Sequence, residues 1–118
     1  MDLTHAIEMH DAWKMKLKNA ITAQETVDAD SLAKDNTCEF GKWLHGEGES
    51  AYGKLPSFST CVAKHAAFHV EAGKVARDIN AKKYKEAEDQ IDFSSTPYGK
   101  AASEVKAAVL HLKQESGT

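Results

Sequence analysis

Two histidines one helical turn apart are the residues in this sequence whose spacing most directly indicates chemistry. His65 and His69 stand four positions apart, so on a helix their Cβ atoms lie about 5–6 Å from each other and both imidazoles reach one metal ion. They fall on an apolar helical stripe, where an imidazole without a hydrogen-bond partner costs free energy. A shared metal ion removes that cost, although such pairs also occur as ordinary core residues.

One further histidine and one cysteine extend this pair to a set of four. His10 lies on the apolar stripe of the first expected helix. Cys38 falls at the start of a short helix, where the helix dipole and free amide groups favour the thiolate. Three imidazoles and one thiolate form a tetrahedral set that suits Zn²⁺, with copper as a competitor in vitro. Spacing alone leaves open that His10 and Cys38 are ordinary buried residues on separate helices.

Helical periodicity predicts the fold class of the elements that carry these residues. The 118 residues are 42% hydrophobic and contain only two prolines and seven glycines, which favours helices around one core. Apolar residues recur at steps of three and four over residues 3–21 and 56–80, the pattern of two amphipathic helices. We therefore expect residues 1–118 to form a single all-α domain.

A short second helix is expected between these two long ones. Asn36 precedes Glu39 by three residues, the spacing of a capping box, so Cys38 would lie in the first turn of this helix. Residues 28–31 and 46–49 are polar or glycine-rich and are interpreted as the connections on either side.

The last element of the bundle is expected to be interrupted. Helical patterns over residues 84–93 and 101–112 are separated by residues 94–97, which end in a proline and predict a break or kink. The resulting expectation is a four-helix bundle with a short second helix that carries the cysteine and a broken or kinked last helix.

Composition excludes several classes of function. A net charge of -3 offers no basic surface for nucleic acid or for an anionic membrane. We find no apolar run of about 20 residues and no signal-peptide pattern at the N-terminus, so we expect a soluble, cytoplasmic chain without membrane insertion. Two cysteines, 23 residues apart in the sequence, are better explained as reduced thiols than as a disulfide framework.

Three ordered motifs resemble those of a known family. Residues 10–14 (HDAWK), 38–48 (CEFGKWLHGEG) and 65–69 (HAAFH) are similar to the three signatures of the bacterial chemoreceptor zinc-binding (CZB) domain, in the same order. The similarity runs from about residue 5 to residue 112. It also includes YGKLP at residues 52–56 and STPY at residues 95–98.

This resemblance implies a zinc site and a regulatory function. It implies that His10, Cys38, His65 and His69 are the zinc ligands of a four-helix bundle. Such domains accompany a chemoreceptor signalling region or a diguanylate cyclase and report zinc availability or oxidants such as hypochlorous acid through the zinc-bound cysteine. We find no such output region in this sequence, so the partner is expected in cis or in trans, and the domain is expected to form a homodimer. The redox-sensitive thiolate would then be that of Cys38.

Several other residues have simpler interpretations. His5, His45 and His111 are interpreted as solvated histidines, and Cys61 as a small buried hydrophobic residue rather than a resolving thiol. Three aromatic residues are core residues that would also surround the site and limit metal exchange, namely Trp13, Phe40 and Trp43. Gly41, inside the short helix, indicates a close approach of a neighbouring segment.

Three classes of function remain to be compared. A zinc hydrolase needs an open coordination position and a general base, which four protein ligands and the lack of an HExxH motif argue against. A di-iron bundle needs carboxylate bridges and Glu-x-x-His motifs, which we do not find. A structural zinc site that only stabilises the fold is the main alternative to a sensor. We therefore expect a non-enzymatic sensory domain.

Overall fold

The computed structural model describes residues 1–117, which form helices and contain no strand. Within this range the helices follow in chain order as α1 (Leu3–Ala23), α2 (Ala29–Leu32), α3 (Glu39–Leu44), α4 (Glu47–Tyr52), α5 (Pro56–Asn80), α6 (Tyr84–Asp92) and α7 (Pro97–Ser116). The all-α prediction is confirmed. None of the helices described combines the length and apolar character needed to cross a lipid bilayer.

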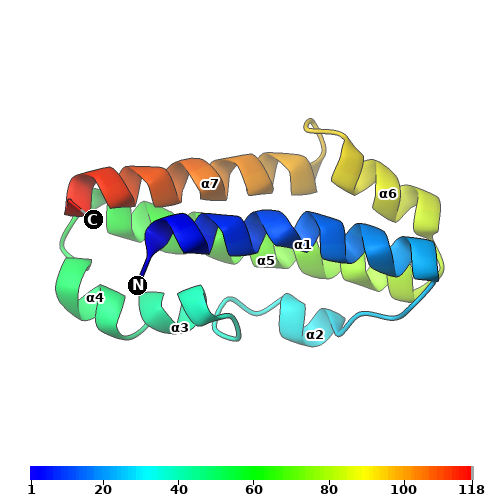
Figure 1. Cartoon of the computed structure of the whole chain (residues 1–118), viewed down its shortest axis with the longest axis horizontal. Coiled ribbons are helices and arrows are strands. Elements are labelled where there is room, and N and C mark those ends of the chain that lie inside the picture. Colours follow the sequence, from blue (N-terminus) through cyan, green and yellow to red (C-terminus); the bar gives the residue numbers. More distant parts are fainter. Residues whose placement is uncertain (118) are drawn as a thin grey trace.

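The long helices form a frame of three rods, of which two run in one direction and the third in the opposite direction (Figure 1). α1 and α5 are two of the rods, and α6 and α7 together make the third (Figure 1). The most extensive packing is that of α5 along α7. We call α1, α5, α6 and α7 the frame. Its interior is a continuous apolar core, which also buries the Cys61 thiol at 0% exposure, as predicted.

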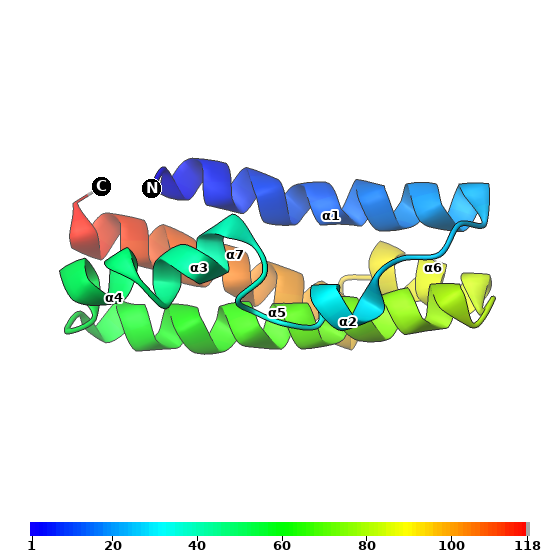
Figure 2. The same ribbon diagram turned by 90° about the horizontal axis from the view of Figure 1, so that it is seen from below.

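The fourth side of the bundle is built from short helices. Residues 24–55, which we call the Cys38 arm, contain α2, α3 and α4 and lie lengthwise along the face formed by α1 and α5 (Figure 2). The backbone of α2 packs against α5, whereas α3 comes close mainly to α4. The arm is fixed to α5 partly by the Asn80 amide group, which donates to the Val27 carbonyl at 2.8 Å and accepts from the Val27 N–H at 2.7 Å.

Local side-chain chemistry explains where the frame helices begin. The Asp2 carboxylate accepts from the backbone N–H of Thr4 and starts α1, and Pro56 occupies the first turn of α5, where its missing N–H needs no partner. The predicted break in the last helix is confirmed between α6 and α7. Thr96 caps α7 by accepting from the N–H of Gly99 at 3.1 Å, so this helix begins at Pro97, four residues before the expected start.

The arm differs from the sequence prediction in three places. Residues 28–31 are not only a connection, because the Asp28 carboxylate accepts from the N–H of Ser31 and caps α2. Residues 46–49 likewise lead into α4. The expected Asn36 cap is wrong: Cys38 itself is the N-cap of α3, and its sulfur accepts from the N–H of Gly41.

Candidate metal centre

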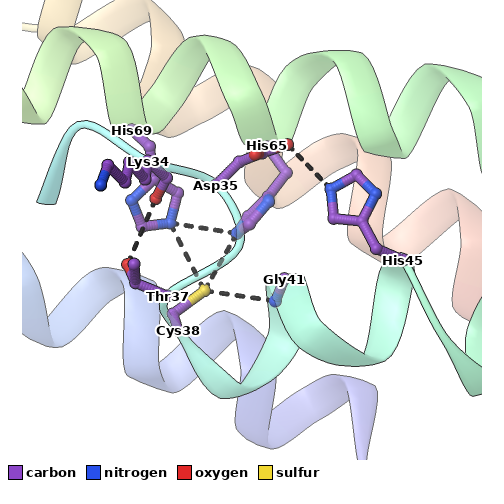
Figure 3. A network of polar contacts seen from close by, with 8 residues as sticks. All are labelled: Lys34, Asp35, Thr37, Cys38, Gly41, His45, His65 and His69. Atoms are coloured by element: carbon purple, nitrogen blue, oxygen red, sulfur yellow. Dashed lines mark hydrogen bonds and ion pairs between the residues drawn. The ribbon is translucent and has the colours of Figure 1, made fainter. Parts of the chain in front are cut away.

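Four side chains from three helices converge inside the bundle. His10 lies on α1, Cys38 caps α3, and His65 and His69 lie one turn apart on α5. One ligand atom from each residue lies within 4.8 Å of those of the other three. Figure 3 shows the Cys38 sulfur facing the rings of His65 and His69. The residues selected from the sequence are thus brought together from positions up to 59 apart in the chain (69 − 10).

Backbone carbonyl groups fix the orientation of two of the imidazoles. His10 Nδ1 lies 2.7 Å from the Ala6 carbonyl oxygen, and His69 Nδ1 lies 2.8 Å from that of Leu32. A carbonyl oxygen only accepts, so Nδ1 carries the proton in both rings and the Nε2 lone pair faces the cluster. Such a bond from the outer ring nitrogen orients histidine as a metal ligand.

The spacing of the inner atoms fits a tetrahedral zinc ion. His65 Nε2 and His69 Nε2 are 3.1 Å apart, and the Cys38 sulfur lies 3.3 and 3.5 Å from them. Tetrahedral Zn–N and Zn–S bonds require nitrogen atoms about 3.3 Å apart and sulfur about 3.6 Å from nitrogen. His10 Nε2 is buried without a hydrogen-bond partner among the described residues. A metal ion would satisfy this atom.

Burial determines the protonation of the three histidines. Desolvation is the main cause that lowers the pKa of His10, His65 and His69, to about 2 for His65, where the neighbouring imidazoles add to the effect. All three rings are therefore neutral near pH 7. Neutral imidazole is the form that binds metal ions.

The thiol of Cys38 behaves differently from the sequence prediction. Burial raises its pKa and outweighs the backbone amides of Gly41 and Phe40, which lower it. The expectation that the helix start alone favours the thiolate is therefore wrong. A divalent cation beside the sulfur would reverse this shift, because a coordinating thiol is deprotonated.

Aromatic rings enclose the cluster on two sides. Phe40 meets the rings of His10 and His65 edge-on at centroid distances of 5.7 and 5.1 Å. Phe68 meets His10 and His69 in the same way at 5.3 and 5.5 Å. An apolar shell of this kind limits solvent access to a metal site. Phe68 is on the predicted apolar stripe of α5, but no signal in the sequence places it at the site.

The two tryptophans singled out from the sequence occupy different positions around the site. Trp43 stacks on Phe40 at a centroid distance of 5.9 Å and so supports the shell from outside. Trp13 is partly buried and lines a pocket beside Cys38 and His69.

A hydrogen bond outside the cluster closes the loop that carries the cysteine. The His45 ring nitrogen Nε2 lies 3.0 Å from the Asp35 carboxylate (Figure 3). The His45 side chain is exposed and lies outside the cluster, as predicted, and this contact is an addition to that prediction. The loop passes so close to α3 that a Cβ atom on Gly41 would overlap the Asp35 carbonyl oxygen. The predicted close approach at Gly41 is confirmed. His5 and His111 are exposed.

Comparison with known proteins identifies a family that this chain matches. Residues 10–76 match the family described as the chemoreceptor zinc-binding domain. Searches of curated proteins and of solved structures found no significant match. The matched range begins at His10 and includes Cys38, His65 and His69.

Proposed function

Since the chain belongs to the chemoreceptor zinc-binding domain family, we propose that it binds one zinc ion through His10, Cys38, His65 and His69 and serves as a sensory domain in bacterial signal transduction. The support is the convergence of these four ligand atoms within 4.8 Å. Bound zinc would hold Cys38 as the thiolate and add folding free energy to the docking of α3. Four protein ligands leave no position for a substrate water, which argues against a hydrolase.

The four candidate ligands differ in burial and in the length of the helix that holds them, and this observation carries the proposal of a sensory function. The three histidines are 7%, 0% and 1% exposed and lie on helices of 21 and 25 residues. Cys38 is half-buried and caps a helix of six residues. A ligand held by so short an element is able to leave while the frame stays folded.

The proposed stimulus acts on Cys38. Chelation would remove the metal, and hypochlorous acid would convert the thiolate to sulfenic acid, with chloride as the reduced product. Either event frees the start of α3 and lets the arm move. The proposed receiver is a chemoreceptor signalling region or a diguanylate cyclase, in cis or in trans, and we propose that the domain acts as a homodimer.

The test is zinc release from Cys38→Ser. Serine can still cap α3 but is a poor zinc ligand, so we expect weaker zinc binding and no zinc release by hypochlorous acid beyond that caused by dilution. Metal analysis and a chromogenic chelator measure both quantities. Cys61→Ala, which changes the buried thiol outside the cluster, should respond as the natural chain does. An unchanged oxidant response in Cys38→Ser would refute the mechanism.

A purely structural zinc site is the alternative. In that case the metal only stabilises the bundle, and chelation should unfold it. Far-ultraviolet circular dichroism during chelation separates the two, because a sensor loses zinc and keeps most of its helix content.

A further inference from the structure

A pocket of about 190 Å³ opens beside the metal centre between α1 and the arm. We call it the Cys38 pocket; the lining residues used below are Asp28, Ser31, Thr37, Cys38 and His69. A pocket of this volume holds several water molecules, since a cavity of about 10–15 Å³ is enough for one. Cys38 and His69, which are two of the four candidate metal ligands, form part of the wall of this pocket.

Approach from the opposite side is much narrower. The cavity that touches His10 between α1 and α7 measures about 10 Å³, which is at the limit for a single water molecule. The three histidines are at most 7% exposed, whereas Cys38 is half-buried. A molecule that arrives from solvent thus meets the Cys38 sulfur through the Cys38 pocket.

Hydrogen bonds hold the rim of the pocket in place. The Thr37 hydroxyl donates to the Ser31 carbonyl oxygen at 2.9 Å, and the Ser31 N–H donates to the Asp28 carboxylate at 3.1 Å. These contacts tie the loop before Cys38 to the start of α2. Figure 3 shows Thr37 beside Cys38 and His69. The opening is therefore a built feature of the arm.

The lining carries one sign of charge. Asp28 contributes a carboxylate, and the remaining lining residues that the structure describes include no lysine or arginine. A carboxylate at an opening lowers the local concentration of anions and leaves uncharged molecules unaffected.

We propose that the Cys38 pocket is a recognition site for a small uncharged electrophile, which it admits to the Cys38 sulfur while Asp28 repels anions. The biological meaning of this site rests on the proposed sensory function, because modification of Cys38 would remove a zinc ligand. Access and charge selectivity are properties of the folded chain and are measurable separately.

Two alkylating reagents of similar size test the proposal. Iodoacetamide is uncharged and iodoacetate is an anion; with both, the Cys38 sulfur forms a bond to carbon and iodide leaves with the electron pair. The purified zinc-loaded protein is treated with each, modification is located by mass spectrometry, and zinc release is followed in the same sample. Cys61, at 0% exposure, is the internal control and should remain unmodified.

Substitutions in the rim give the expected signature. Ser31→Phe fills the opening and should slow modification of Cys38 by about tenfold with both reagents, since thiol reactivity follows access. Asp28→Asn retains the helix cap. It should raise the rate at which iodoacetate modifies Cys38 about threefold and leave the rate with iodoacetamide unchanged. Ser59→Phe, at an exposed position of α5, should change neither rate. If Ser31→Phe loses helix content, Thr37→Phe provides the same block.

The outcomes distinguish this proposal from the proposed function. Equal rates in Ser31→Phe and the natural chain, or a Cys61 that reacts as fast as Cys38, would overturn the pocket as the route. An unchanged preference between the two reagents in Asp28→Asn would overturn the charge selectivity. A purified chain without zinc would count against the proposed function, while the alkylation rates would still decide on the pocket.

Discussion

The frame and the Cys38 arm present the side chains of the candidate metal centre by different means. The frame presents His10, His65 and His69 from long helices, where each ring is buried in a packed core. The arm presents Cys38 from the end of a short helix, held by the N–H of Gly41 and by local contacts of the loop.

This difference teaches which part of the molecule depends on the metal. We expect the packing of α7 along α5 and α1 to stabilise the frame without help from zinc, because helices of this length bury a continuous apolar face. A helix of six residues is marginal by itself, so the position of α3 depends on its anchors. The comparison predicts that loss of zinc changes the arm and spares the frame.

The largest expected effect on zinc affinity is that of removing a histidine ligand. His65→Ala should weaken zinc binding by more than about 100-fold, since removal of supporting groups around a metal site already costs 10- to 100-fold. Competition with a chromogenic chelator measures the affinity. His111→Ala, at an exposed position of α7, is the control. Zinc affinity within twofold of the natural chain would show that His65 is not a ligand.

A smaller effect is expected from a change in the arm that leaves all four ligands intact. Gly41→Ala places a Cβ against the Asp35 carbonyl oxygen, and we expect zinc binding about tenfold weaker because the loop that carries Cys38 must shift. In a helix without this contact, alanine would instead stabilise by about 1 kcal/mol. Lys42→Ala, at the next and exposed position, controls for general effects on α3. An affinity equal to that of the control would contradict the expected coupling.

The Asp35 and His45 contact should contribute less. Both side chains are partly exposed, at 29% and 43%, and exposed pairs contribute about 0.2–1 kcal/mol. Asp35→Asn should therefore speed zinc release by at most about fivefold and leave the melting temperature of the frame unchanged. Stopped-flow transfer of zinc to a chelator measures this rate; a rate more than tenfold higher would mean that the contact is a main anchor of the arm.

The smallest effect is expected in the frame, far from the zinc. The N–H and hydroxyl of Ser57 both donate to Glu115, at 3.0 and 2.8 Å, and lower the pKa of this carboxyl. Its contribution to stability is present above the ordinary pKa of glutamate and is lost as the pH falls through the lowered value. The melting-temperature difference from Glu115→Gln should thus shrink in acid, with zinc affinity unchanged at pH 7. A melting-temperature difference that grows as the pH falls would contradict this expectation.

The same contrast explains what could be predicted from the sequence. The long periodic segments of the sequence predict α1 and α5, and the spacing of His65 and His69 indicates a shared metal ion. The helices α2 and α4 were missed because four to six residues show too little periodicity. The Leu32 carbonyl that orients His69 could not be predicted, because every residue has a carbonyl group and only the tertiary structure decides which one reaches the ring.

Hydrogen–deuterium exchange before and after zinc removal tests the central claim most directly. Exchange of backbone amides reports local opening, and peptides from the arm and the frame are resolved in one mass-spectrometry experiment. We predict that chelation speeds exchange in residues 28–53 by about tenfold or more, while peptides from α5 and α7 change by less than about twofold. Equal acceleration in the frame and the arm would contradict the account and would identify the zinc as a structural ion for the whole bundle.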